Sequence, residues 1–150
     1  MFSSITEKFN QTFNISLYDN NDNKNNNNND YSECKFIQKF KKQKLENRLK
    51  MHYDIFLKYP DRIPMIVDTK KEIVLNKNKF IVPKDLIVSQ FVYMLKKRIQ
   101  LNASDTIYLL CNNKLLVSTN TVSQIYSENK ETDGFLYIVI AMENTFGNNN

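Results

Sequence analysis

The 150-residue sequence has few cysteines, histidines and glycines: two, one and two, respectively. Cys34 and Cys111 show no spacing that indicates a disulfide framework or a zinc site, so a reducing compartment is expected. No glycine-rich phosphate loop, paired-carboxylate pattern or metal-ligand cluster is present, which argues against an enzyme. Cys111 has no obvious histidine partner and is expected to be a buried structural thiol, and His52 to be a surface or half-buried helix residue.

Long hydrophobic runs are also missing. No apolar stretch approaches the length that spans a bilayer, and residues 1–17 lack the pattern of a signal peptide. We therefore expect a soluble, cytoplasmic protein unless something is attached to it. The formal net charge is +5, from 21 basic and 16 acidic residues. Such an excess suits anionic membrane surfaces, acidic peptides or nucleic acid.

The composition divides the chain into three parts. Residues 1–17 carry a weak amphipathic pattern, and residues 20–30 are an asparagine-rich low-complexity stretch that buries no apolar surface. We expect residues 1–33 to be a disordered extension, residues 34–143 to be one folded domain, and residues 144–150 to be a flexible tail.

The sequence of the first half of the domain predicts a helix followed by a β-hairpin. Residues 36–59 have helical periodicity, and the helix must end before Pro60. Strands are predicted at 62–68 and 80–82. Pro64 lies inside the first strand, so its nitrogen should face away from a partner strand. The core-facing stripe of the helix consists of Leu45, Leu49, Tyr53 and Phe56.

The second half predicts a helix at 87–101, a strand at 107–111, a turn at Asn112-Asn113 with a short return at 114–117, and a brief helix at 122–128. The run from Phe135 to Ile140 is continuously apolar, which is typical of a strand buried on both faces at the centre of a sheet. The predicted fold is therefore α+β: a ubiquitin-like β-grasp with a mixed four-stranded sheet and one or more extra N-terminal helices.

Four separated segments, in this order, resemble the autophagy ubiquitin-like modifiers, the family of GABARAP. The resemblance covers roughly residues 45–147, and residues 1–33 have no counterpart in it. Met51 stands where relatives often carry an acidic residue. The segments are KYPDRIPMIV (58–67), KFIVPKDL (79–86), QFVY with KRI (90–93 and 97–99), and DGFLY with ENTFG (133–137 and 143–147).

The resemblance implies a conjugation cycle at the tail. A cysteine protease would cut between Gly147 and Asn148, after the Phe146-Gly147 pair, and activating and conjugating enzymes would pass Gly147 to the amine of phosphatidylethanolamine. Glycine suits this chemistry because it has no side chain to obstruct a narrow active site. The product would sit on the autophagosomal membrane, with the covalent lipid and no other cofactor. An isolated Phe-Gly pair would otherwise be read as an ordinary chain end.

The resemblance also implies docking of acid-flanked aromatic-x-x-aliphatic motifs from receptors and adaptors, by strand addition to the second strand. The first pocket would be lined by Ile55, Pro64, Ile66, Lys79, Ile81 and Phe135. The second would be lined by Phe80, Val82, Pro83, Leu86, Phe91 and Met94. Arg62, Lys77 and Arg98 would receive the acids of the peptide. Without the resemblance, core packing would be the simpler interpretation of the apolar residues.

Two other functions compete with the modifier. A nucleic-acid binder would use the basic residues between Phe36 and Phe56, but the aromatic residues there are assigned to a core stripe and leave few for base stacking, so no nucleic-acid partner is expected. A ubiquitin-like interaction module that is never conjugated would keep the pockets and make Gly147 irrelevant.

Overall fold

The last strand of the chain, β5 (Leu136–Met142), lies in the middle of the sheet, as its continuous apolar run predicts. It pairs in parallel with β1 (Arg62–Thr69) on one side and antiparallel with β3 (Ile107–Cys111) on the other. The outer strands are β2 (Lys79–Pro83) beside β1 and the two-residue β4 (Lys114–Leu115) beside β3. The structure, a computed structural model, describes residues 31–70, 73–99, 101–102 and 104–142.

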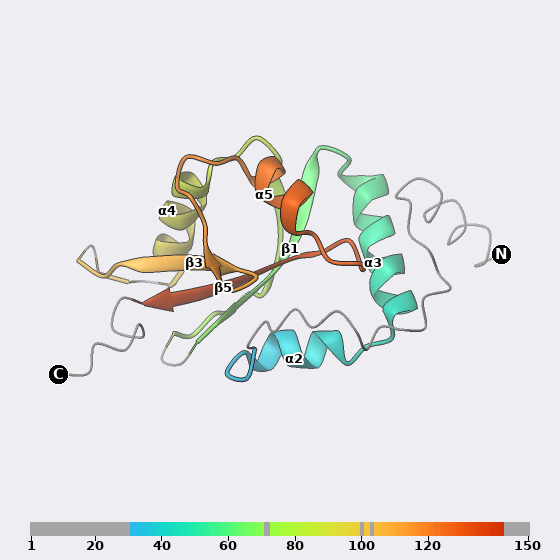
Figure 1. Ribbon diagram of the computed structural model, residues 1–150, viewed down its shortest axis with the longest axis horizontal. Helices are drawn as coiled ribbons and strands as arrows, with labels where there is room; N and C mark the ends of the chain where they lie inside the picture. Colours follow the sequence, from blue (N-terminus) through green and yellow to red (C-terminus); the bar gives the residue numbers. More distant parts are fainter. Residues whose placement is uncertain (1–30, 71–72, 100, 103, 143–150) are drawn as a thin grey trace.

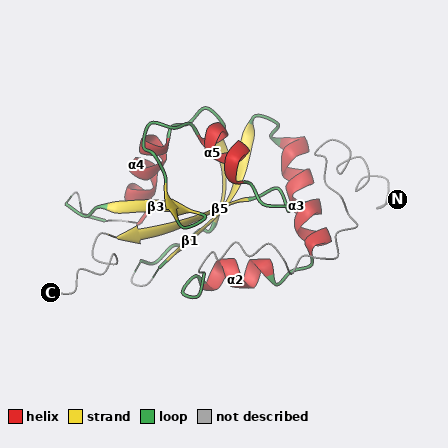
Figure 2. Cartoon of the chain, viewed as in Figure 1, coloured by secondary structure: helices red, strands yellow, loops and turns green. Residues whose placement is uncertain are grey.

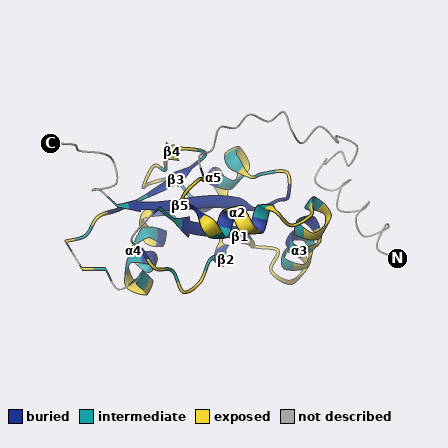
Figure 3. Cartoon of the chain, turned by 90° about the horizontal axis from the view of Figure 1, so that it is seen from below, coloured by how far each residue is buried: buried dark blue, intermediate teal, exposed yellow. Residues whose placement is uncertain are grey.

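Helices cover both faces of this sheet (Figures 1 and 2). On one face lie α4 (Val88–Ile99) and α5 (Val122–Asn129), which pack against side chains such as Leu136 and Ile138. On the other face lies α2 (Lys35–Lys41), across β1 and β5, with β5 buried beneath it (Figure 3). The α+β, ubiquitin-like arrangement predicted from the sequence is confirmed, with β4 as a fifth strand of the mixed sheet.

The predicted helical stretch at 36–59 is two helices, α2 and α3 (Leu45–Lys58), separated by the exposed residues 42–44. α2 follows the face of the sheet, whereas α3 runs along its end (Figure 1). The two helices cannot be continuous, because each buries its apolar side against a different part of the sheet. α3 ends before Pro60, as predicted.

Pro64 occupies β1 without loss of a ladder bond. The Val67 N–H donates to the Asn78 carbonyl at 2.8 Å, so Val67 faces β2. The two-residue alternation of a strand then turns the Pro64 nitrogen to the opposite side. Pairing of β1 with β5 begins only at Met65, one residue later. The nitrogen therefore meets no strand partner, as the sequence predicts.

The extra N-terminal helix α2 is held by a carboxylate from the sheet. Asp68, on β1, accepts hydrogen bonds from the N–H groups of Phe36 (2.8 Å) and Ile37 (3.0 Å) at the start of α2. The N-cap residue Cys34 makes no side-chain cap of its own. A buried carboxylate that satisfies the first free amides of a helix also favours its dipole. Asp68 therefore fixes where α2 begins.

The turn before β5 requires glycine. Gly134 has φ +87°, a conformation that residues with a side chain rarely adopt, and a methyl group there would lie 2.6 Å from His52 Cγ. His52 is 2% exposed, so the expectation of a surface or half-buried histidine is wrong. Its ring lies edge-on to Phe135, with centroids 5.9 Å apart. The side chain of α3 thus packs directly on the turn that leads into the central strand.

Gly134→Ala is expected to lower the free energy of unfolding by about 2–4 kcal/mol, because it adds left-handed strain to a clash with the His52 ring. Chemical denaturation measures this. In the double variant Gly134→Ala with His52→Ala the clash is removed, so its loss should be smaller than the sum of the two single losses. Strict additivity would contradict the close contact.

Asp68→Ala is expected to cost about 1–3 kcal/mol of stability and to speed hydrogen exchange at the Phe36 and Ile37 amides, because both lose their acceptor. Asp61→Ala is the matched control, since Asp61 is 85% exposed and its pairing with Lys84 contributes little. Equal effects of the two substitutions would contradict the role assigned to Asp68.

Candidate functional site

Among the strands that the structure describes, β2 has β1 as its one neighbour, so the outer side of β2 is an open sheet edge. Asn78 bonds to Val67 of β1, and the same alternation turns the backbones of Phe80 and Val82 toward β1. The N–H and C=O groups of Lys79 and Ile81 therefore face outward. An edge of this kind offers a row of backbone donors and acceptors to an added strand.

Side chains of β1 and β2 point alternately to the two faces of the sheet. Ile66 belongs to the apolar cluster beneath α2, whereas Phe80 and Val82 belong to the cluster beneath α4 and α5. Alternation places Lys79 and Ile81 on the same face as Ile66. The two predicted residue sets thus lie on opposite faces of the hairpin, with the open edge between them.

The first predicted set is anchored by Ile66 and Phe135, which are 0% and 1% exposed, with Ile55 of α3 packed against the same cluster. Phe40 of α2 contacts the Phe135 ring edge-on, with centroids 5.2 Å apart. Phe40 was not among the predicted site residues, because the sequence left the first helix undecided. Pro64 is buried on the same face, but it lines a separate hollow at the end of the sheet.

Lys79 lies across this first set. Its Nζ is 5.6 Å from the centroid of the Phe40 ring and 3.7 Å from Met51 Sδ. Both contacts come from the N-terminal helices, so α2 and α3 determine where the ammonium group sits. A cation held over apolar groups at the edge strand is suitably placed to meet an acidic group on a docked chain.

The second predicted set is mostly core. Phe80, Val82 and Phe91 are 4%, 3% and 2% exposed, and the Phe80 and Phe91 rings contact edge-on at 6.0 Å. Leu86 and Met94 pack against this core and are half-buried, so they reach the surface. Pro83 is exposed at the end of β2. The buried residues of this set can form the floor of a pocket, and the half-buried Leu86 and Met94 can form its rim.

The three predicted cationic residues do not gather at one point. Lys77 Nζ and Arg98 Cζ lie 5.4 and 5.7 Å from the Phe80 ring centroid, so both flank the second set. Arg62 pairs with Pro83 at the other end of the hairpin and reaches the Ile81 carbonyl at 3.5 Å. Positive charge therefore stands at both ends of the open edge, which suits a peptide with acids on either side of its core.

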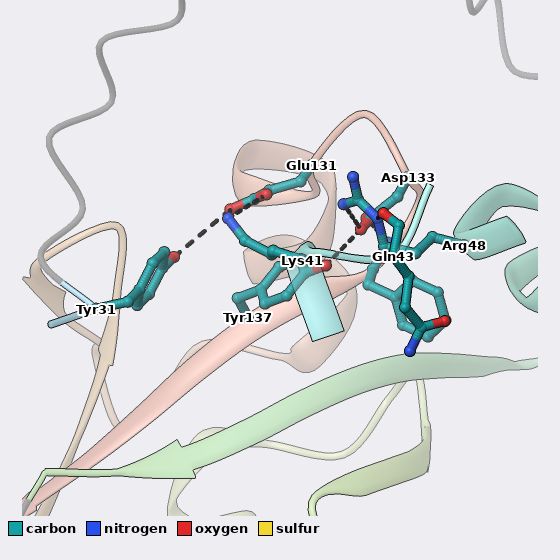
Figure 4. A network of polar contacts seen from close by, with 8 residues as sticks. Tyr31, Lys41, Gln43, Arg48, Glu131, Asp133 and Tyr137 are labelled. Carbon is teal, nitrogen blue, oxygen red and sulfur yellow. Dashed lines mark hydrogen bonds and ion pairs between the residues drawn. The ribbon is translucent and has the colours of Figure 1, made fainter. Parts of the chain in front are cut away.

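A polar network that the sequence did not reveal fixes the N-terminal helices to the loop before β5 (Figure 4). Asp133, 0% exposed, accepts from Arg48 of α3 at 2.8 Å, from the Phe135 N–H at 2.9 Å and from the Tyr137 hydroxyl. Burial and the Asp133 charge raise the pKa of Tyr137, so its hydroxyl stays a donor. Lys41 of α2 pairs with Glu131 at 2.7 Å.

Cys111 is buried, as expected, and its pKa is raised to about 12 by burial and by the Glu131 charge. Such a thiol is a poor nucleophile at neutral pH. In the part of the chain that the structure describes, no cluster of three His, Cys, Asp or Glu residues could hold a metal ion. The helices of that part are also too short or too polar to span a bilayer. The described residues exclude the predicted extension before residue 31 and the tail from residue 143, which contains Phe146 and Gly147.

Comparison with known proteins places this geometry in a family. The model of the ubiquitin-like autophagy protein Atg8 family matches residues 47–147. Autophagy-related protein 8a of Arabidopsis thaliana is 44% identical over 106 residues, which are 69% of this chain and 87% of the relative. Autophagy-related protein 8h of the same plant is 39% identical over 115 residues, 74% of this chain and 97% of the relative.

A solved structure supports the same family assignment. The crystal structure of Trypanosoma brucei ATG8 superimposes with a TM-score of 0.65 at 36% sequence identity, covering 68% of this chain and 90% of that one. Proteins of this family are ubiquitin-like modifiers and not enzymes themselves, in agreement with the expectation from the sequence motifs. With a family model that matches more than half of its length, and with 97% of the Arabidopsis relative 8h covered at 39% identity, the chain belongs to the Atg8 family of ubiquitin-like autophagy proteins.

Proposed function

We propose that this protein docks aromatic-x-x-aliphatic motifs of receptors and adaptors along the outer edge of β2. The observation that carries the proposal is the open edge of β2 with an apolar residue set on each face of its hairpin. The added strand would bond to the outward backbone groups of Lys79 and Ile81. Its aromatic side chain would enter the Ile66–Phe135 side, and its aliphatic side chain would enter the Phe80–Phe91 side.

The second part of the proposal is conjugation. A cysteine protease would remove residues 148–150 after Gly147, and activating and conjugating enzymes would join Gly147 to phosphatidylethanolamine. Family membership and the Phe146-Gly147 pair support this step. The two acyl chains would hold the domain on autophagosomal membranes, and the unconjugated form would stay in the cytoplasm. The docking edge would then bring receptors to that membrane.

Ile81→Asp is expected to weaken binding of a fluorescein-labelled aromatic-x-x-aliphatic peptide by at least about tenfold, because it places a charge at the centre of the apolar docking strand. Fluorescence anisotropy measures the affinity. Leu115→Asp is the matched control: Leu115 is 56% exposed and lies on β4, the opposite edge of the sheet. Unchanged affinity for Ile81→Asp, or an equal loss for Leu115→Asp, would contradict the docking edge.

Gly147→Ala is expected to block both C-terminal processing and the appearance of a lipid-bearing species, because the added methyl group hinders the protease and the conjugating enzymes. Mass spectrometry of the protein recovered from its own cells detects both. Asn149→Ala should leave processing unchanged. An intact Asn150 end in every wild-type molecule would remove conjugation and leave an unconjugated interaction module.

A further inference from the structure

A hollow of about 160 Å³ opens at the end of the sheet, and of the predicted docking residues only Arg62 and Pro64 line it. It is bounded by His52 and Phe56 of α3, by the first residues of β1, and by Ser123 and Tyr126 of α5. These elements come from three separate stretches of the chain and meet at the same end of the molecule (Figure 1). The edge residues Lys79 and Ile81 do not line this hollow.

The floor of the hollow is electrically neutral. His52 is buried, and burial lowers its pKa to about 4, so the imidazole is uncharged at neutral pH. The Tyr126 hydroxyl donates to the Gly134 carbonyl at 2.7 Å and lies 3.1 Å from His52 Nε2. Its polar end is therefore engaged within the protein. Ile63 and Pro64, both buried, add further apolar surface.

The rim of the hollow is positive. Arg62 and Lys84 line it, and both are exposed, whereas no carboxylate lines it within the described part of the chain. Lys84 pairs with Asp61, whose Oδ1 lies 3.3 Å from Lys84 Nζ. Because both of these side chains are largely exposed, this pair is weak and leaves the ammonium group available to a stronger acidic partner.

Size and charge together define the ligand. A cavity of about 150 Å³ with apolar walls holds one benzene molecule, so this hollow has room for one branched aliphatic or phenyl-sized group. Two cations at its mouth favour a carboxylate beside that group. We propose that the hollow is a second peptide-docking pocket, which takes one apolar side chain of an acidic peptide while Arg62 and Lys84 contact the flanking carboxylates.

This pocket differs from the docking edge in most of its residues, although it shares Arg62 and Pro64 with the predicted docking residues. Its walls come from α3, β1 and α5, whereas the edge residues Lys79 and Ile81 do not line it. Arg62 stands between the two, since it pairs with Pro83 at the end of the hairpin. The protein is therefore able to hold one partner along β2 and a second, or a distant segment of the same one, at the end of the sheet.

The test uses the full chain labelled with ¹⁵N and a nine-residue peptide that contains one leucine among glutamates and no aromatic residue. Amide shifts are expected around Lys84, Ser123 and Tyr126, and not at Lys79 or Ile81. Ser123→Phe should abolish them, because Ser123 is exposed at the mouth and a phenyl ring there fills the space. Ser127→Phe, four residues further along α5 and also exposed, should leave them unchanged.

A second pair of variants tests the contribution of charge to peptide binding. Lys84→Glu should weaken the peptide about three- to tenfold, whereas Lys114→Glu, the same charge change on β4, should not. Binding that survives Ser123→Phe, or shifts confined to the β2 edge, would overturn the proposal. So would binding of phosphatidylserine vesicles at this pocket without binding of the peptide. Ile81→Asp should leave this binding intact, so the pocket and the docking edge can fail separately.

Discussion

The parallel pairing of β1 with β5 is the constraint on which the rest of this structure depends. It inserts the last strand between elements made earlier in the chain and leaves β2 and β4 at the two edges. Side chains of β5 alternate between the two apolar clusters, with Leu136 and Ile138 on one face and Tyr137 and Val139 on the other. Burial of both faces requires helices on both, and the open edge of β2 follows from the same topology.

Two buried carboxylates connect the N-terminal helices to that sheet. Asp68 fixes the beginning of α2, and Asp133 holds Arg48 of α3 against the turn before β5. Removal of one partner from a buried ion pair is costly because the remaining charge stays buried. These contacts matter for the site, because α2 and α3 bring Phe40, Met51 and Ile55 to the first residue set. The N-terminal helices thus form one wall of the proposed docking surface.

The fold was predictable where one physical signal was sufficient. The unbroken apolar run identified β5, Pro60 ended α3, and Asn112-Asn113 identified a turn in which both residues have positive φ. Prediction failed where the structure depends on contacts between residues that are far apart in the sequence. The break between α2 and α3 depends on which part of the sheet each helix meets. Burial of His52 depends on its contact with Gly134, far away in the sequence. The residue alternation of β2 correctly placed Phe80 and Val82 on one face of the sheet, but it could not show that Phe80, Val82 and Phe91 are nearly closed to solvent.

Amide hydrogen exchange tests strand addition at the outer edge of β2 most directly. The experiment compares the full chain alone with the chain saturated by an aromatic-x-x-aliphatic peptide. Exchange at the outward amides of Lys79 and Ile81 should slow strongly on binding, whereas the inward amides of Phe80 and Val82, already paired with β1, should change little. Equal protection of all four amides, or protection confined to β4, would contradict strand addition at β2.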